Sequence, residues 1–192
     1  MTKLSICVYC GSRPGELPAY AEAARAVGTE IGRRGWRLVY GGGRAGLMGE
    51  VADATLSAGG EVVGVIPESL MGHELGHRGL MELHVVDTMH QRKTMMAERS
   101  DAFLALPGGI GTFEELFEVW TWRQLGYHDK PVGLLNVAGY YDALLNFLTH
   151  SREQGFMTTA QTDLLHVADD PMALLQRLAE HAPQRSGDYR RI

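Results

Sequence analysis

Apolar positions along the chain fall into short continuous runs, separated by longer segments in which apolar residues recur every three or four positions. Strands that are buried on both faces have such uninterrupted runs, whereas a strand with one solvated face alternates apolar and polar residues. The pattern therefore predicts buried strands at residues 4–9, 37–40, 62–66, 84–86, 102–106, 132–135 and 165–167.

The segments between these runs have the spacing of amphipathic helices. In the first of them Ala24, Val27 and Ile31 share one stripe, as residues three and four apart do on a helix. Helices are predicted at residues 18–34, 47–58, 88–100, 111–126, 141–154 and 172–182. The alternation of strands and helices indicates an α/β fold, with a mostly parallel sheet covered by helices on both faces. We expect a single Rossmann-like domain over residues 1–182 and a polar, flexible tail at 183–192.

Glycines gather where the predicted strands end, which indicates a ligand-binding site at that edge of the sheet. The chain has 24 glycines among 192 residues, well above the average share of roughly 7%. Ligands of parallel sheets bind at the carboxyl ends of the strands, beside the point where the strand order reverses. Glycine there lets the backbone approach a phosphate closely. The candidates for a phosphate loop are Ser12, Gly42, Gly43 and Gly108.

The segment PGGIGTFEE, which begins at Pro107, is the most informative of these loops. Pro107 ends the strand because it has no amide proton for the ladder. Gly108, Gly109 and Gly111 allow close approach to a ligand and a positive φ angle. The free amides at the start of the next helix carry the positive end of its dipole, and the Thr112 hydroxyl adds a donor. Such a turn suits a phosphomonoester and needs no metal.

Two glutamates follow this turn directly. Glu114 has an ordinary explanation, since the helix dipole favours a carboxylate in the first turn by about 0.3–1 kcal/mol. A carboxylate beside a bound phosphate is otherwise repulsive, and it is useful if the ligand develops positive charge during a reaction. Ribose does so when an N-glycosidic bond breaks, and Glu115 would then stabilise the oxocarbenium-like state or activate the attacking water.

A second cluster lies in the segment MHQRK, residues 89–93. On a helix Met89, Arg92, Lys93 and Met96 share one face. Two methionines beside two cations suit a planar base next to an anion. A surface helix with an apolar stripe would give the same spacing.

Other motifs match known kinds of site less well. Gly41, Gly43 and Gly46 fit a dinucleotide fingerprint, but Glu61 precedes the next strand instead of ending it. The segment HELGH, residues 73–77, resembles a zinc-protease helix, yet glycines interrupt and flank it. The two cysteines lie three apart on one strand and face opposite ways, so core thiols fit better than a redox pair. We expect neither a cofactor nor a metal.

Charge and hydropathy limit the partners. The formal net charge is -5 and the isoelectric point is near 5.9, whereas a nucleic-acid surface needs clustered positive charge. No apolar run reaches the ~18–20 residues of a membrane helix, and the first strand follows the N-terminus without a signal peptide. These features predict a cytoplasmic protein that binds a small molecule, with neither nucleic acid nor a membrane as partner.

Two motifs together, MHQRK at residues 89–93 and PGGIGTFEE at 107–115, resemble the Lonely guy (LOG) family of cytokinin riboside 5′-monophosphate phosphoribohydrolases. The stretches GVIPESLMGHE, SDAFLALPGG, TWRQLGYHDKPVGLLN and GYYD are similar to the family as well, and the likeness extends to about Ala182. It implies a Rossmann-like sheet and a homodimer with active sites near the interface. It also implies hydrolysis of a nucleoside 5′-monophosphate to free base and ribose 5-phosphate.

The resemblance assigns roles to individual residues. Arg92 and Glu115 match the catalytic pair of the family, and Glu74 falls at a glutamate that binds the base. Together with the residues chosen above, the expected substrate-binding set is Glu74, Met89, Lys93, Gly109, Ile110, Gly111, Thr112, Glu114 and Thr121.

Two other functions are alternatives for a chain with these features. A carrier of a phosphorylated cofactor, such as a molybdenum-cofactor carrier, has a similar fold and needs the phosphate loop but not the pair of Arg92 and Glu115. A lysine decarboxylase needs a Schiff-base lysine in a pyridoxal phosphate site, and the sequence offers no such context. The sequence leaves open the preferred base, the proton donor to that base, and whether the role is hormone activation or nucleotide salvage.

Overall fold

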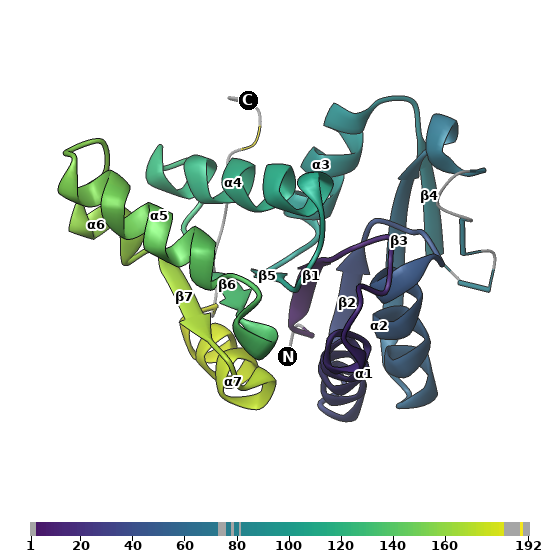
Figure 1. The fold of residues 1–192 in the computed structure, drawn as a ribbon. Helices are drawn as coiled ribbons and strands as arrows, with labels where there is room; N and C mark the ends of the chain where they lie inside the picture. The colour runs from purple at the N-terminus through teal and green to yellow at the C-terminus, as the bar shows by residue number, and fades with distance from the viewer. Residues whose placement is uncertain (1–2, 73–75, 78, 81, 183–188, 190–192) are drawn as a thin grey trace.

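The computed structural model describes residues 3–72, 76–77, 79–80, 82–182 and 189. These residues form a seven-stranded parallel sheet with the order β4-β3-β2-β1-β5-β6-β7 (Figure 1). The strands are β1 (Ser5–Tyr9), β2 (Arg37–Tyr40), β3 (Glu61–Pro67), β4 (Glu82–Val86), β5 (Ala102–Ala105), β6 (Val132–Leu135) and β7 (Leu165–Ala168). The predicted α/β fold with a parallel sheet is confirmed.

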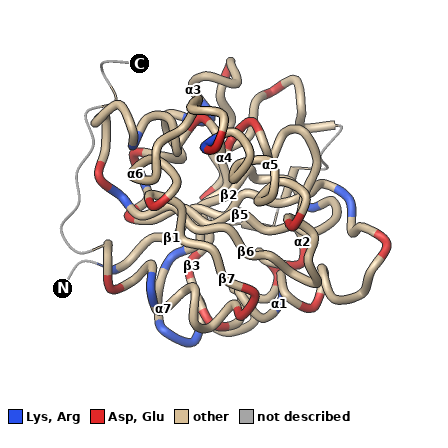
Figure 2. Tube along the Cα trace, turned by 60° about the vertical axis from the view of Figure 1, so that its left-hand side comes forward, with Lys and Arg blue, Asp and Glu red and all other residues tan. Residues whose placement is uncertain are grey.

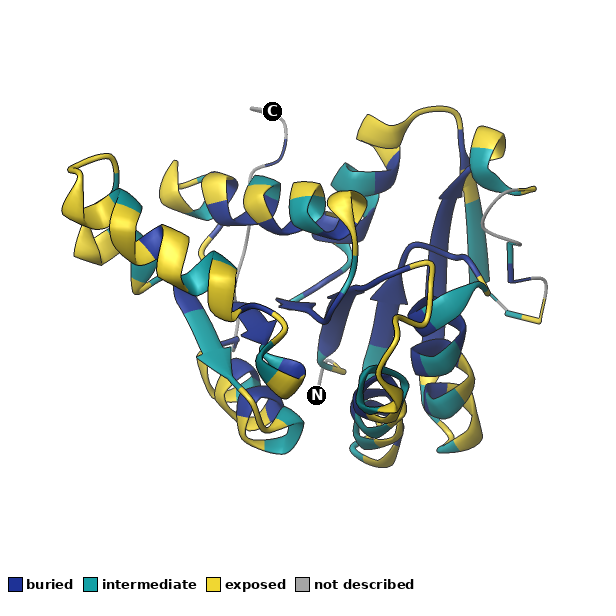
Figure 3. Cartoon of the chain, in the orientation of Figure 1, coloured by how far each residue is buried: buried dark blue, intermediate teal, exposed yellow. Residues whose placement is uncertain are grey.

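Helices cover both faces of the sheet, as Figure 1 shows. One face packs against α1 (Pro18–Arg33), α2 (Gly46–Ser57) and α7 (Pro171–His181), and the other against α3 (Met89–Glu98), α4 (Ile110–Gln124) and α5 (Asp142–Glu153). The short helix α6 (Thr159–Thr162) and two 3-10 turns, Glu68–Leu70 and Val137–Gly139, complete the described elements. In Figure 3 the buried residues lie in the strands and on the inner sides of these helices.

The inner strands contribute to two separate cores, because successive side chains of a strand point to opposite faces. Ile6 and Val8 of β1 face the core under α1 and α2, whereas Cys7 and Tyr9 face the core under α3 and α4. Both faces are therefore apolar, which explains the continuous apolar runs in the sequence. Cys7 and Cys10 are buried free thiols, and burial raises the pKa of Cys7 to about 12, so this thiol stays protonated.

The strand order reverses between β1 and β5, in the middle of the sheet. The chain runs from β1 outward to β4 on one side, then returns to place β5 against the other side of β1. The loops after β1 and after β5 consequently lead away from each other. A crevice between such diverging loops is the usual ligand site of open α/β sheets.

The predicted boundaries agree with the structure to within one or two residues for most elements. Helix α6 and the two 3-10 turns were not predicted, because segments of three or four residues are too short to show a period. Beyond residue 182 the structure describes Tyr189, whose ring is buried against Trp122 and His128, with the Lys130 ammonium 4.9 Å from its centre.

Acidic and basic positions are interspersed over the helices and loops (Figure 2). In the described part of the chain, none of the helices combines the length and the apolar character needed to cross a membrane.

Candidate active site

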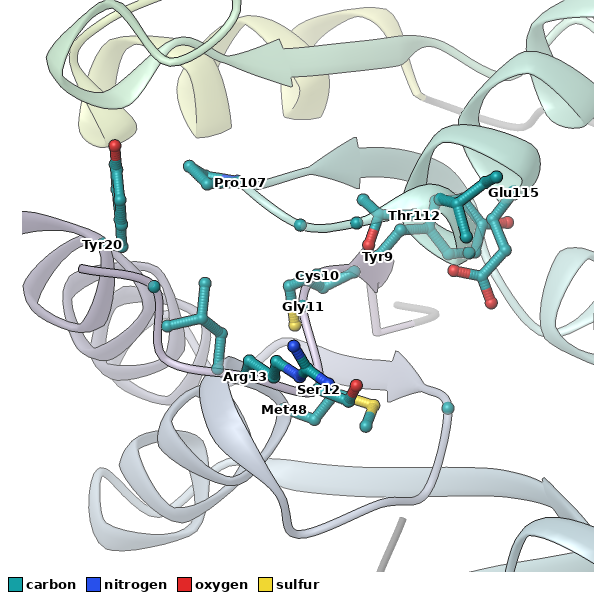
Figure 4. Close-up of a pocket in the computed structure, with 18 of the residues that line it drawn as sticks. Tyr9, Cys10, Gly11, Ser12, Arg13, Tyr20, Met48, Pro107, Thr112 and Glu115 are labelled. Atoms are coloured by element: carbon teal, nitrogen blue, oxygen red, sulfur yellow. The ribbon is translucent and has the colours of Figure 1, made fainter. Parts of the chain in front are cut away.

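A cavity of about 470 Å³ opens where the strand order reverses. Its wall is formed by the loop after β1, the turn between β5 and α4, Gly41 at the end of β2, and side chains of α3. In Figure 4 the turn that starts at Pro107 lies across the cavity from Ser12 and Arg13. The phosphate-loop candidates Ser12 and Gly108 both line this cavity.

The turn between β5 and α4 is built for close contact with a small ligand. Helix α4 begins at Ile110 after the N-cap residue Gly109, and within the described structure no side chain caps it. The amides of its first turn are therefore available to an anion at the positive end of the helix dipole. Gly109, Ile110, Gly111 and Thr112, four of the predicted substrate-binding residues, line the cavity.

The glycines of the turn are required because they lack a Cβ, not because the backbone there has unusual angles. A Cβ at Gly108 would overlap the Oγ1 atom of Thr112, so no larger residue fits there. Among the described residues, a Cβ at Gly109 or Gly111 would meet no atom within 4 Å beyond its chain neighbours and the backbone of its own helix, which leaves that side of the turn open to a ligand. The expectation of positive φ angles was wrong, since none of these three glycines has one.

Hydrogen bonds from neighbouring segments hold the turn in place. The Gly11 amide donates to the Pro107 carbonyl at 3.1 Å. The Tyr140 hydroxyl donates to the Gly108 carbonyl at 2.5 Å, and the Tyr141 hydroxyl donates to the Leu106 carbonyl at 2.6 Å. The amides that face the cavity are thus positioned before any ligand arrives, as electrostatic binding requires.

Arg92 forms a fixed cationic part of the wall. Arg92 is buried, with 4% of its surface exposed. Its Nε donates to the Val65 carbonyl at 3.1 Å, and its Nη2 donates to the Gly41 carbonyl at 2.7 Å. Its Nη1 lies 3.7 Å from the Met89 sulfur, and Met89 also lines the cavity. A Cβ at Gly41 would overlap the guanidinium, so this glycine makes room for Arg92.

The two adjacent glutamates of α4 point to different surroundings. Glu115 is partly buried and lines the cavity, which it shares with Arg92 and the glycine turn. Glu114 is exposed, and its carboxylate accepts a hydrogen bond from Lys93 at 2.5 Å. Neighbouring helix residues are about 100° apart around the axis, and this rotation separates a carboxylate in the cavity from one on the surface.

Three of the predicted substrate-binding residues on α3 and α4 lie outside the described cavity wall. The Lys93 ammonium contacts the carboxylates of Glu114 and Glu118, the latter at 2.9 Å. Burial by itself would lower the pKa of Lys93, but the hydrogen bonds that its ammonium donates to the two glutamates raise the pKa overall. Thr121 is exposed on α4. Lys93, Glu114 and Thr121 are not among the described residues that line the cavity.

Gly42 and Gly43 contact a neighbouring segment. The Gly42 carbonyl accepts from the His77 amide at 2.8 Å, and Gly43 forms a bridge with Gly76. Gly42 has a φ of 75°, a conformation that suits glycine. Neither residue is among the described residues that line the cavity, so this part of the loop supports the strand ends instead of the ligand wall.

The prediction for Glu74 lies outside the described residues. Nearby His77 is buried and its Nε2 lies 2.9 Å from an Asp53 carboxylate oxygen. The residues that the structure describes contain no group of three His, Cys, Asp or Glu side chains placed to hold a metal.

Several cavity residues were not singled out as site residues from the sequence, namely Arg13, Tyr20, Met48, Leu70 and Tyr140. Their signals are weak in sequence, because each belongs to a different segment and none forms a spaced motif. Arg13 directly follows Gly11 and Ser12 at the end of the central strand, and that position was the available clue.

Comparison with known proteins places the chain in a family. The family model described as "Possible lysine decarboxylase" matches residues 48–178. A cytokinin riboside 5′-monophosphate phosphoribohydrolase of Arabidopsis thaliana is 51% identical over 178 residues, which are 93% of this chain and 83% of that protein. The enzyme of the same name from Rhodococcoides fascians is 52% identical over 170 residues, or 88% of this chain and 86% of that protein.

Solved structures with the same fold include the molybdenum cofactor binding protein of Rippkaea orientalis, with a TM-score of 0.72 and 22% identity over 94% of this chain and 98% of that one. The molybdenum cofactor carrier protein of Chlamydomonas reinhardtii has a TM-score of 0.70 and 22% identity, with the same coverage. At this identity the likeness concerns the fold alone. The identity of about one half with the phosphoribohydrolases over nearly the whole chain is decisive, and the chain belongs to the Lonely guy (LOG) family of cytokinin riboside 5′-monophosphate phosphoribohydrolases.

Proposed function

We propose that the protein hydrolyses the N-glycosidic bond of nucleoside 5′-monophosphates, including those of cytokinin ribosides, and releases the free base and ribose 5-phosphate. One observation carries the proposal: the glycine turn, Arg92 and Glu115 open onto the same cavity. Its volume of about 470 Å³ lies within the ~300–1,000 Å³ of small-molecule sites. The names of the relatives at about 50% identity support the same reaction.

The phosphate binds at the N-terminus of α4. The open side of Gly109 and Gly111 admits its oxygens, and the first-turn amides and the Thr112 hydroxyl donate to them. Because Glu115 lies on the same helix one turn further along, a phosphate held there brings the ribose close to the carboxylate.

Glu115 acts on the ribose as its bond to the base breaks. The electrons of the C1′–N bond leave with the base, and the ribose becomes oxocarbenium-like. The Glu115 carboxylate stabilises this positive charge and takes a proton from the attacking water. In the net reaction the hydroxyl of water ends on C1′ and its proton on the departing base.

Arg92 binds and orients the substrate. An arginine guanidinium offers hydrogen-bond donors and no acceptor, so it serves to bind the substrate and not to transfer protons. Its hydrogen bonds to the Val65 and Gly41 carbonyls fix its direction, which limits the entropy lost when the substrate binds.

A homodimer forms part of the proposal. One exposed stripe of α4 contains Ile110, Phe117 and Thr121 and continues to Leu125, the C-cap residue, with Ile110 86% exposed. Ile110 also lines the cavity, so a second copy packed on this stripe would adjoin the active site and cover its apolar side chains. Light scattering on the purified protein should give twice the chain mass, and Phe117→Glu should shift it toward the monomer. A wild-type monomer would contradict this assembly.

The catalytic proposal is tested by a matched pair of variants on one helix. Adenosine monophosphate and isopentenyladenosine monophosphate are incubated with wild type, Glu115→Gln and Glu114→Gln, and free base is measured by chromatography. We expect Glu115→Gln to lose on the order of 10²–10⁴ in kcat and Glu114→Gln to keep most of it, since only Glu115 lines the cavity. Equal activity of Glu115→Gln and wild type would refute the role of this carboxylate.

The same assay separates the hydrolase from a carrier of phosphorylated cofactors. A carrier would bind the nucleotides tightly and release no base. The position of Glu115 in the cavity argues against a carrier, because a carboxylate beside a purely anionic cargo weakens binding. A parallel incubation with a chelator tests for a metal, and activity that falls with the chelator would contradict the metal-free mechanism.

A further inference from the structure

We propose that Arg13 is the cation that binds the substrate phosphate and gives the site its preference for phosphorylated substrates. The inference rests on the proposed function and extends it to a residue outside the two family motifs. It follows from the charges at the cavity, the free state of the Arg13 side chain, and the fixed state of its backbone.

The cavity needs a cation that is available to a ligand. A phosphomonoester carries a charge of about -1.5 to -2 near neutral pH, and the lysine and arginine residues in the described cavity wall are Arg13 and Arg92. Arg92 is bound to two backbone carbonyls. Lys93, a predicted substrate-binding residue, is paired with Glu114 and Glu118 and is not part of the described cavity wall. Arg13 is therefore the cation best placed to bind the phosphate.

The Arg13 side chain makes no ion pair within the described part of the chain. Other arginines are engaged: Arg25 pairs with Glu50 at 2.8 Å, and Arg99 pairs with Glu82 at 2.8 Å. Arg13 is exposed at the cavity, and among the described residues its guanidinium has neither a hydrogen bond nor an ion pair, so its fork is open to a ligand. Such a planar fork matches two oxygens of a phosphate at once.

The backbone under Arg13 is fixed. Gly46 has a φ of 58°, and a Cβ there would overlap the Ser12 carbonyl carbon and the Arg13 amide nitrogen. The Gly11 carbonyl accepts from the Leu47 amide at 3.0 Å, and the Gly11 amide donates to Pro107. Helix α2 and the β5–α4 turn thus anchor the loop on both sides. A ligand has only the side chain to order, which keeps the entropic cost of binding small.

The geometry places the two phosphate ligands across from each other. Figure 4 shows Arg13 on one side of the cavity and the turn from Pro107 to Thr112 on the other. A phosphate seated on the α4 amides has its outer oxygens directed at the loop after β1. Arg13 closes over them from that side, and a nucleoside without the phosphate gains nothing from it.

The test compares Arg13→Ala, Arg13→Lys and the matched control Arg33→Ala. Arg33 is exposed in the last turn of α1, at the end of the helix away from the cavity, and its replacement changes the net charge equally. Calorimetry measures the Kd for ribose 5-phosphate, and steady-state kinetics measure KM and kcat for adenosine monophosphate.

We expect Arg13→Ala to raise Kd and KM roughly 10-fold to 100-fold, the effect of a lost hydrogen bond to a charged group. Its kcat should stay within about threefold of wild type, Arg13→Lys should recover part of the affinity, and Arg33→Ala should match wild type. Equal Kd values for Arg13→Ala and wild type, or an equal loss in Arg33→Ala, would overturn the inference.

The two proposals fail in different ways. If wild type released no base from either nucleotide, the hydrolase would be refuted. The comparison of ribose 5-phosphate binding by wild type and Arg13→Ala would still decide the role of Arg13. Absence of ribose 5-phosphate binding by wild type would overturn the phosphate site and with it the role of Arg13.

Discussion

Tyr140 and Tyr141 allow the contributions of one hydroxyl group to stability and to ligand binding to be separated. The two are adjacent, and each donates a hydrogen bond to a carbonyl of the β5–α4 turn. Tyr141 is 1% exposed, and its acceptor Leu106 is fully buried, whereas Tyr140 is 38% exposed and lines the cavity. The same substitution to phenylalanine removes the same atom in two different environments.

The expected magnitudes follow from these environments. Tyr141→Phe leaves the buried Leu106 carbonyl without this donor, which should lower the free energy of unfolding by about 1–3 kcal/mol. For a chain of this size that corresponds to a fall in Tm of roughly 2–12 °C. After Tyr140→Phe water can reach the Gly108 carbonyl, so the loss of stability should stay below about 1 kcal/mol. Its effect should instead be a higher KM, because the Gly108 segment is no longer held in the binding position.

Urea unfolding and calorimetry on both variants, followed by base-release kinetics, measure these quantities. The reasoning would be refuted if Tyr140→Phe destabilised the protein as much as Tyr141→Phe. It would also be refuted if Tyr140→Phe left KM unchanged, since the hydrogen bond to Gly108 would then have no part in positioning the turn.

Two further predictions concern acid stability and the glycine turn. Burial lowers the pKa of His128 to about 4, so between about pH 6.5 and 4 the unfolded chain binds a proton that the folded chain does not. The free energy of unfolding should therefore fall by about 3 kcal/mol as the pH is lowered through that range. An equally steep loss in urea titrations of a His128→Gln variant would contradict this. Gly108→Ala should lower Tm, because the new Cβ overlaps Thr112. Gly109→Ala places its Cβ in open space, so it should keep the wild-type Tm and raise KM. Equal Tm values for the two variants would contradict the packing argument.

Much of the fold follows from local sequence patterns. Continuous apolar runs identify strands that are buried on both faces, and the three-to-four-residue period identifies the helices between them. Proline and glycines mark the turn before α4 because they limit which backbone conformations are possible. The sequence also predicted that Glu115 and Arg92 belong together, but through the spacing of family motifs, not through any local physical signal.

The tertiary structure decided which residues meet. Arg92 reaches the carbonyls of Val65 and Gly41, which are 27 and 51 positions away, and the strand order brings them together. The helical period places Lys93 on one face with Arg92. The packing of α3 against α4 nevertheless brings the Lys93 ammonium into ion pairs with Glu114 and Glu118.

The role proposed for Arg13 depends on the tertiary structure, which places the loop after β1 opposite the turn after β5. The spacing of apolar residues along the chain indicates which face of a helix or strand is buried, because residues on one face recur at a fixed interval in the sequence. The partner of each side chain depends on the order of the strands and the crossing of the helices, and both arise from contacts between residues far apart in the chain.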